Sequence, residues 1–419
     1  MSGFSITFSL RKFKTILTKF LDVRLLSLWL FFGVLIGVPI GLCSSLFLVL
    51  LDLITDFRDL NFWIIALLPL VGLLIGFLYK EAGKRIYLGT NLIFQEYFLQ
   101  QKILPLIMAP LIFVATLLTH LVGGSAGREG TAVQMGAVIA DQFYPWSKHL
   151  KLHRDVFILA GVAAGFASLF GTPWAGAIFA VEIFRNKTVR WVALFPALLT
   201  SFTAYYTCHW TGASHMAYPN IHVPHFSWSM LALIVFCGAL FGLTARGFIK
   251  LQILMEYFSE KICKSQLWRP FFGGIVLLVV YYFVNSSRYM GLGIPVILES
   301  FDRQVLPYDF IAKLFLTVIT LGFGFKGGEV TPLFFIGATL GNTISLFIPL
   351  PFSFLSALGF IAVFSGSTNT FLACAIMGIE LFGFEAAPYF LVVTLVSQLF
   401  SGRKSIYKDQ PSNKFSIYR

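Results

Sequence analysis

Long apolar runs without Asp, Glu, Lys or Arg recur along the whole chain. They cover residues 27–51, 61–79, 103–127, 156–181, 191–215, 226–245 and 386–402. A helix needs roughly 20 apolar residues to cross the hydrocarbon layer of a bilayer, so each run can supply one span. A further charge-free run, 330–379, is too long for one span, and Pro349 and Pro351 mark a break inside it. We therefore predict an all-α polytopic membrane protein with at least nine membrane segments, several of them broken or partial.

The composition indicates that a bilayer is the solvent of this chain. Of its 419 residues 57% are hydrophobic and only 12% are charged, and Phe alone occurs 47 times. These values exclude a water-soluble core. The five cysteines have neither metal-ligand nor disulfide spacing, and we expect them to be packing residues.

The formal net charge of +12 does not indicate nucleic-acid binding, because the basic residues are dispersed or flank apolar spans. Arg11, Lys12, Lys14, Lys19 and Arg24 precede the first span, and Arg403, Lys404, Lys408, Lys414 and Arg419 follow the last. The positive-inside rule then predicts that both termini are cytoplasmic. We expect a multi-pass protein of the cell's inner membrane. Residues 1–24 lack a signal-cleavage site, and we expect 4–21 to form an amphipathic interfacial helix. Residues 403–419 are expected to be a short basic tail with no regulatory domain.

An internal duplication with a period near 200 residues is the strongest organisational signal. Three matches occur in the same order in both halves: 89–93 with 291–295, 127–137 with 328–338, and 177–184 with 375–382. We therefore predict a first membrane repeat at 25–215 and a second at 216–402. Such repeats commonly have opposed orientations and place a substrate site at their interface near the middle of the membrane. The alternative is a larger bundle without a site.

Glycine-rich segments precede a predicted helix in each repeat. The first is Gly123-Gly-Ser-Ala-Gly-Arg-Glu-Gly-Thr131, which enters a helical pattern at Ala132, and the second is Phe325-Lys-Gly-Gly-Glu-Val-Thr-Pro332. Glycines let the backbone approach a ligand closely, and free amides at a helix N-terminus attract an anion. Two such ends facing each other would replace the lost hydration of an anion.

Glu129 is the leading candidate for a functional carboxylate. An ionisable group at membrane depth is costly and usually functional, and this one could take up a proton near neutral pH. As a carboxylate it could also occupy the anion site itself. The alternative is a static ion pair with the neighbouring Arg128.

These motifs together resemble the CLC family of chloride channels and proton-coupled anion exchangers. The resemblance rests on Gly127-Arg-Glu-Gly130, Gly328-Glu-Val-Thr-Pro332, Gly291-Leu-Gly-Ile-Pro295 and the duplication, and it covers nearly the whole chain. It implies inverted repeats of broken, tilted helices, a homodimer with one pore per subunit, and Glu129 as the gating and proton-accepting residue. It implies anion contacts at Gly127, Arg128, Gly130, Thr131, Thr90, Asn91, Val330, Thr331 and Tyr407.

Departures from the chloride-type pattern make the chain similar to the fluoride/proton antiporter branch. The first half has Gly89-Thr-Asn-Leu-Ile93 where the chloride type has Gly-Ser-Gly-Ile-Pro, and Thr131 replaces a proline. The second half brings in Glu329 as a second carboxylate. Fluoride is small and accepts hydrogen bonds strongly, so hydroxyl or amide donors such as Thr331, Thr90 or Asn91 suit it.

Several other polar positions leave alternatives open. Glu329 is either a second coupling carboxylate or a structural contact, for instance with Lys326. Tyr407 either lines the inner pore, as the resemblance implies, or belongs to an interfacial aromatic belt. The inner proton-transfer glutamate of chloride/proton exchangers would fall at Ile183, so it is missing.

Glu182 and Glu380 occupy equivalent places in the two repeats, which favours a shared structural duty such as a hydrogen bond to a loop. The paired histidines His149 and His153, and His222 and His225, lie in polar connections, so we expect solvated side chains and no metal site. No cofactor is expected.

The favoured function is fluoride export coupled to proton import, with fluoride or chloride, protons and the bilayer as partners and no nucleic acid. The alternative within the family is a chloride/proton exchanger or a voltage-gated type chloride channel. An intramembrane enzyme is a distant alternative, because the sequence has no HExxH, no Gly-x-Ser-x-Gly and no paired intramembrane aspartates.

Overall fold

The computed structural model describes residues 23–185, 193–213, 215–219, 221–284 and 286–412, and throughout these ranges the regular structure is helical. The first half contains α2 (Val23–Leu60), η1 (Phe62–Leu67), α3 (Leu68–Ala82), η2 (Ile86–Leu88), α4 (Thr90–Leu99), α5 (Met108–Leu121), α6 (Glu129–Asp141), α7 (Tyr144–Ser147), η3 (Lys148–Leu150), α8 (Arg154–Phe170), α9 (Pro173–Ile183) and α10 (Leu194–Trp210). The second half contains α11 (Trp228–Ile262), α12 (Arg269–Val284), η5 (Ser287–Tyr289), α13 (Ile294–Asp302), α14 (Asp309–Gly322), α15 (Val330–Ile344), α16 (Phe352–Thr368), α17 (Phe371–Phe382), η6 (Phe384–Ala386) and α18 (Ala387–Ser401).

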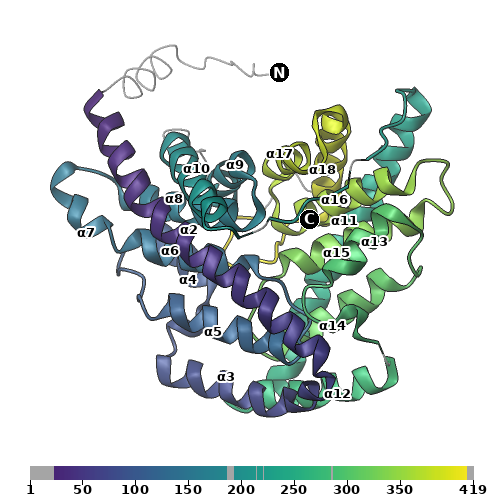
Figure 1. Ribbon diagram of the computed structural model, residues 1–419, viewed down its shortest axis with the longest axis horizontal. Coiled ribbons are helices and arrows are strands. Elements are labelled where there is room, and N and C mark those ends of the chain that lie inside the picture. The colour runs from purple at the N-terminus through teal and green to yellow at the C-terminus, as the bar shows by residue number, and fades with distance from the viewer. Residues whose placement is uncertain (1–22, 186–192, 214, 220, 285, 413–419) are drawn as a thin grey trace, which may run out of the picture.

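Helices of similar length recur in the same order in the two halves. The long α2 corresponds to α11, the short α4 to α13, and the series α5, α6, α8, α9 to α14, α15, α16, α17. Figure 1 shows the two halves side by side, with α9 beside α17 and α3 beside α12. An antiparallel β-bridge joins Gly127 to Gly328, so the segments that lead into α6 and α15 run in opposite directions where they meet.

The apolar runs of the sequence form helices of very unequal length. Four helical segments are long and apolar enough to cross a membrane, namely 23–60, 62–82, 228–262 and 384–401, by length and composition and among the described residues. The run 156–181 is divided into α8 and α9 at Thr172, and the run 330–379 into α15, α16 and α17. Pro351 is the N-cap of α16, as the break at Pro349 and Pro351 predicted.

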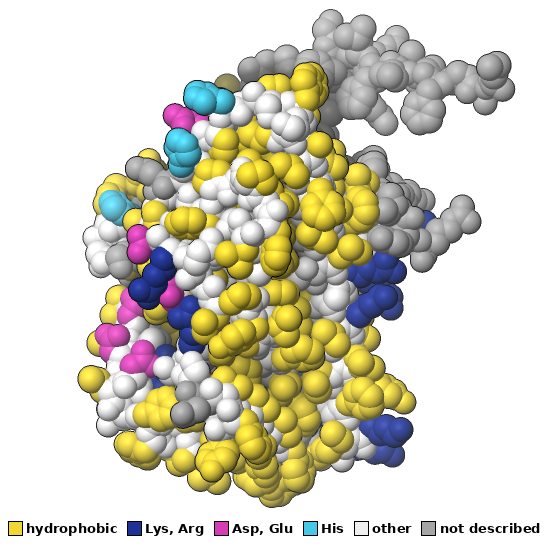
Figure 2. Space-filling view, turned by 90° about the vertical axis from the view of Figure 1, so that its right-hand side faces the viewer, with side chains coloured by type: hydrophobic (Ala, Val, Ile, Leu, Met, Phe, Trp, Pro, Cys, Tyr) yellow, Lys and Arg dark blue, Asp and Glu magenta, His cyan; other side chains and the backbone are white. Residues whose placement is uncertain are grey.

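The surface is apolar over a broad face, as a bilayer solvent requires. Figure 2 shows hydrophobic side chains over most of that face, with Lys and Arg side chains at both edges and acidic and His side chains gathered near one of them. The exposed hydrophobic residues include Phe236, Leu243, Phe272 and Phe315. A membrane-embedded surface accounts for this exposure, because a water-exposed patch of this extent is unusual.

Two helix boundaries differ from the sequence-based expectation. Helix α6 begins at Glu129 and not at Ala132, because the glycine-rich segment ends sooner. Helix α11 extends well beyond the charge-free run that ends at Ala245, because a helix can continue past the hydrocarbon layer with charged side chains. The expected interfacial helix at residues 4–21 lies outside the described residues.

Glycines bring the helices behind the site into close contact in both repeats. A Cβ atom at Gly136 of α6 would overlap the carbonyl oxygen of Gly161 in α8, and one at Gly337 of α15 would overlap that of Gly359 in α16. Small residues at such crossings are typical of helix packing in membranes. The pairs fix the positions of α6 and α15 against the helices behind them.

We expect Gly337→Ala to destabilise the protein by about 1–3 kcal/mol, because the added methyl group forces α15 away from α16. Thermal unfolding of the purified protein in detergent measures the effect. Gly247→Ala is the matched control, since a Cβ at this position in α11 meets no atom within 4 Å. Equal stability of the two variants would contradict the close contact.

Candidate functional site

The N-termini of α6 and α15 meet at the centre of the molecule. Gly127 N–H donates to Gly328 O at 2.5 Å, and Gly328 N–H donates to Gly127 O at 2.8 Å. Helix α6 begins two residues after the first glycine, and α15 begins two residues after the second. The bridge therefore holds two positive helix ends side by side.

The Glu129 carboxylate lies between these two helix ends and is almost completely buried, with 1% of the residue exposed. Its Oε2 accepts the Thr331 N–H at 3.1 Å and the Arg128 N–H at 3.0 Å. The Thr331 hydroxyl donates to Oε1. Negative charge at this position is thus bound by donors from both repeats, as an anion would be.

The neighbours of Glu129 take part in close packing around the carboxylate. The Gly127 amide is used in the bridge, and a Cβ at this position would lie 2.5 Å from Glu129 Oε2, so the site requires glycine here. A Cβ at Gly130 would lie 3.2 Å from Gly328 Cα. The Thr131 hydroxyl is bonded to the Thr116 hydroxyl at 2.6 Å, between α5 and α6, and is not directed at the site.

Arg128 does not form the static ion pair that was the alternative for Glu129. Among the ion pairs of the described ranges, none joins these two side chains, and the buried Arg128 Nε has no hydrogen-bond partner there. The side chain lines a small pocket on one side of the carboxylate together with Tyr218, Phe334 and Thr331. This pocket has a volume of only about 10 Å³, about enough for one water molecule. Glu129 and Thr331, which are bonded to each other, therefore form part of the wall of this small pocket.

A larger cavity of about 390 Å³ is lined by residues on either side of Gly328, namely Gly327 and Glu329, among others. Its walls include four of the predicted site residues, Thr90, Asn91, Glu329 and Tyr407. The structure thus places Tyr407 at the cavity and not in an interfacial belt, with its ring 5.6 Å from that of Phe94. Val330 supplies the first residue of α15 and is buried.

The predicted residues accordingly fall into three groups. Glu129, Thr331, Gly127, Gly130, Val330 and the Arg128 amide form the closed centre, whereas Thr90, Asn91, Glu329 and Tyr407 line the cavity. Thr131 belongs to neither, because its hydroxyl lies in the contact between α5 and α6.

Glu329 is the N-cap residue of α15 and is only partly buried. The expected contact with Lys326 is not among the ion pairs of the described chain. The Lys326 ammonium instead lies over the rings of Tyr79 and Tyr87, at 4.3 Å from each centroid. The carboxylate is therefore available to the cavity.

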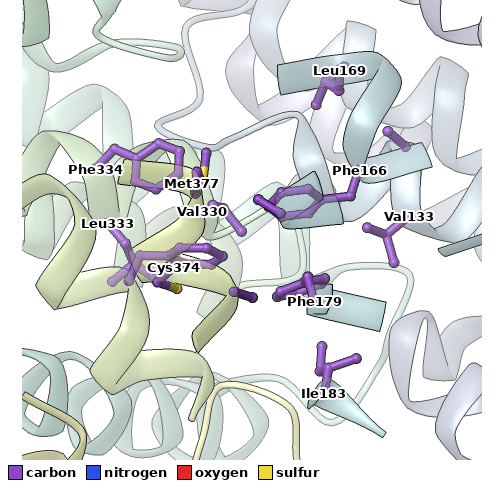
Figure 3. Close-up of a cluster of buried hydrophobic side chains, with 14 of the residues drawn as sticks. Val133, Phe166, Leu169, Phe179, Ile183, Val330, Leu333, Phe334, Cys374 and Met377 are labelled. Atoms are coloured by element: carbon purple, nitrogen blue, oxygen red, sulfur yellow. The ribbon is translucent and has the colours of Figure 1, made fainter. Parts of the chain in front are cut away.

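The position where chloride/proton exchangers carry an inner glutamate is apolar. Ile183 is 2% exposed, and Figure 3 shows it at one end of a buried hydrophobic cluster between the two repeats. Phe179, Phe166 and Val330 continue the cluster toward the helix N-termini. A proton would have no carboxylate to use at residue 183.

The equivalent glutamates Glu182 and Glu380 cap each other's repeats. Glu182 accepts N–H groups of Leu372 and Ala373 at the start of α17 at 3.3 and 2.9 Å. Glu380 accepts those of Trp174 and Ala175 at the start of α9 at 3.0 and 2.8 Å. The predicted shared structural duty is confirmed, although the partners are helix N-termini and not a loop.

We expect Glu380→Ala to cost about 1–2 kcal/mol of stability, because two amides at the start of α9 lose their acceptor. Thermal unfolding in detergent measures the loss. Glu385→Ala serves as the control, since Glu385 is exposed in the neighbouring η6. If Glu385→Ala lowered the stability as much as Glu380→Ala does, the bonds from Glu380 to the start of α9 would not be the cause of the loss.

Sequence reasoning missed three polar residues. Gln134 lines the cavity and donates to the Thr90 hydroxyl at 3.1 Å; an amide in the apolar α6 was the available signal. Lys313 is completely buried and donates to Tyr289 O at 3.0 Å and Gly291 O at 2.6 Å. Lys313 lies outside the charge-free runs of the sequence, so those runs do not point to it. Tyr218 lies in a connection with no pattern that would have singled it out.

Comparisons with known proteins identify relatives along most of the chain. Residues 71–402 match the family model described as voltage gated chloride channel. A protein of Pseudomonas syringae pv. tomato named chloride/fluoride channel protein is 41% identical over 389 residues, which cover 91% of this chain and 86% of that protein.

Two solved structures are similar in fold. The crystal structure of a CLC-type fluoride/proton antiporter has a TM-score of 0.89 and 35% identity, covering 93% of this chain and 99% of that one. A slow cyanobacterial Cl⁻/H⁺ antiporter has a TM-score of 0.78 at 20% identity, covering 90% and 96%. The second likeness concerns the fold alone.

Proposed function

The chain belongs to the voltage-gated chloride channel family of membrane transport proteins, and we propose that it exports fluoride in exchange for protons. The observation that carries this proposal is the binding of the Glu129 carboxylate by the Thr331 hydroxyl and by the Thr331 and Arg128 amides. A group that fills an anion site in its charged form leaves it readily when protonated. One residue can therefore alternate between holding a proton and closing the passage.

The donors at this position favour fluoride over larger halides. A hydroxyl and two main-chain N–H groups converge on one carboxylate. Small, strongly hydrogen-bonding anions lose the most on leaving water and gain the most from such donors. The relatives named for fluoride support the same choice.

In the proposed cycle, a proton from outside neutralises Glu129 and weakens its bonds to Thr331. Fluoride from the cavity that Thr90, Asn91 and Tyr407 line then takes over the donors of Thr331, and the proton continues inward. Glu329, at the start of α15 and on the cavity wall, is the second coupling carboxylate. It replaces the glutamate that is missing at Ile183.

The proposal includes the placement of the chain in the cell. We place the protein in the inner membrane with both termini cytoplasmic, as a homodimer with one pore per subunit. Residues 25–215 and 216–402 are the two inverted repeats, and the recurring helices and the antiparallel bridge support this division. Light scattering in detergent tests the dimer.

Fluoride efflux from liposomes that contain the purified protein tests the function directly. We expect fluoride to leave much faster than chloride, and proton entry to accompany it and to drive it against a fluoride gradient. A fluoride electrode and an internal pH dye measure the two fluxes together. Equal transport of fluoride and chloride would overturn the selectivity, and fluoride efflux without proton entry would overturn the exchange.

A further inference from the structure

A basic groove lies between the middle of α11 and the segment that follows α18. It has a volume of about 420 Å³ and is lined by Arg246, Ile249, Lys250, Ile253, Ser401, Gly402, Arg403 and Lys404. Four of these eight residues are cationic, and no acidic residue is among the described residues that line the groove. The groove is separate from the cavity that contains Glu329 and Tyr407.

The charges converge from two distant parts of the chain. Arg246 lies against the turn after α18, because its Nε is 3.9 Å from where a Cβ of Gly402 would stand. Gly402 has a φ of 101°, a left-handed value that suits glycine, and it ends α18 so that Arg403 and Lys404 turn toward α11. Lys250, Arg403 and Lys404 are exposed. This convergence forms one site for an anionic group that accepts several hydrogen bonds.

The spacing of residues along α11 fits a groove at the depth of a lipid headgroup. Trp228, which is 78% exposed, begins α11 and is typical of one membrane boundary. A helix rises 1.5 Å per residue, so Lys250 stands about 33 Å further along, close to the roughly 30 Å thickness of the hydrocarbon layer.

The groove is also open to acyl chains. Leu243, Arg246, Lys250 and Ile253 follow one another at helical spacing of three and four residues, so they share a face of α11. Leu243 is 42% and Ile253 38% exposed, and Ile249 forms an apolar wall. A ligand bound here meets cations at its head and a hydrocarbon-facing surface on the membrane side.

We propose that this groove binds the phosphate headgroup of an anionic phospholipid, with its acyl chains along α11. Free phosphate would satisfy the cations but would leave the apolar face of α11 unused. Basic pockets beside membrane helices bind such headgroups through several Lys and Arg contacts. Because the site joins α11 to the end of α18, occupancy ties these two helices together.

Thermal unfolding of the full-length protein in detergent, with added phosphatidylglycerol, tests the proposal. We expect phosphatidylglycerol to raise the unfolding midpoint, because it binds the folded protein. In the triple variant Lys250→Gln, Arg403→Gln, Lys404→Gln the affinity for this lipid should fall about 100-fold. The triple variant Lys80→Gln, Lys84→Gln, Lys151→Gln is the control, since it removes the same charge at exposed positions away from the groove.

The outcomes distinguish a lipid headgroup from free phosphate as the ligand, and the groove from other basic positions as the site. If phosphatidylcholine raised the unfolding midpoint as much as phosphatidylglycerol does, the groove would not be an anionic lipid site. The same would follow if phosphatidylglycerol stabilised the two triple variants equally. Stabilisation by inorganic phosphate equal to that by the lipid would overturn the lipid as the ligand. Fluoride transport is measured separately, so a failure here leaves the exchange mechanism untouched.

Discussion

Replacing Glu129 with Gln should abolish proton coupling and lower proton transport by about 100-fold or more, the scale of a lost acid–base group. Glutamine has nearly the same shape, and its amide oxygen can still accept the hydroxyl and amide donors of Thr331. The glutamine side chain, however, cannot take up and release a proton near neutral pH. Simultaneous records of fluoride efflux and internal pH in liposomes measure both fluxes of the variant.

The comparison variant is Glu81→Gln, which removes an exposed carboxylate in the last turn of α3. It should transport both ions at the rate of the unchanged protein. Thermal unfolding of Glu129→Gln in detergent establishes that the variant is folded. If a folded Glu129→Gln protein still imported protons in step with fluoride efflux, Glu129 would not be the coupling residue.

Replacing Thr331 with Val should weaken fluoride transport by about 10- to 100-fold. The change keeps the side-chain shape and the main-chain N–H but removes the hydroxyl that is bonded to Glu129. A hydrogen bond to a charged group contributes about 1.5–3 kcal/mol, which corresponds to this factor. Initial rates of fluoride efflux at several fluoride concentrations measure it.

Thr131→Val is a closely matched control, because it makes the same change at the start of the symmetry-related helix α6. The Thr131 hydroxyl is bonded to Thr116, and both residues are fully buried. This variant should lose stability and keep its selectivity for fluoride. Equal loss of fluoride transport in the two variants would show that the Thr331 hydroxyl has no special role.

The sequence could point to Glu129 and its helix end because the chemistry of this position is local. Glu129 follows glycines in a motif that recurs near Gly328, and a helix N-terminus requires only a short segment to form. The partner of Glu129 could also be placed, because the repeat brought Val330 and Thr331 to the matching helix end. The contact of the Thr131 hydroxyl with Thr116 could not be predicted in this way, since sequence position does not give the direction of a side chain.

Contacts between distant segments of the chain could not be predicted from the sequence. Lys326 has an acidic neighbour along the chain, yet it lies over the rings of Tyr79 and Tyr87, more than 200 residues away in sequence. Gln134 reaches Thr90 across two helices. Such partners depend on how helices cross, and the crossings depend on glycines such as Gly337 whose effect is visible only beside the opposing backbone.

The sequence by itself determined that this is a helical membrane protein built from two related halves, because apolar length and repeated motifs are properties of the chain alone. It also determined that Glu129 stands at a helix N-terminus at membrane depth. Only the tertiary structure decided which groups bind that carboxylate, that Glu182 and Glu380 cap opposite repeats, and that Lys250 and Arg403 share one groove. The contacts of Glu129, Glu182 and Glu380 join helices from the two halves, whereas the groove joins α11 to the segment after α18 within the second half. All of them depend on how helices pack, which the sequence alone does not give.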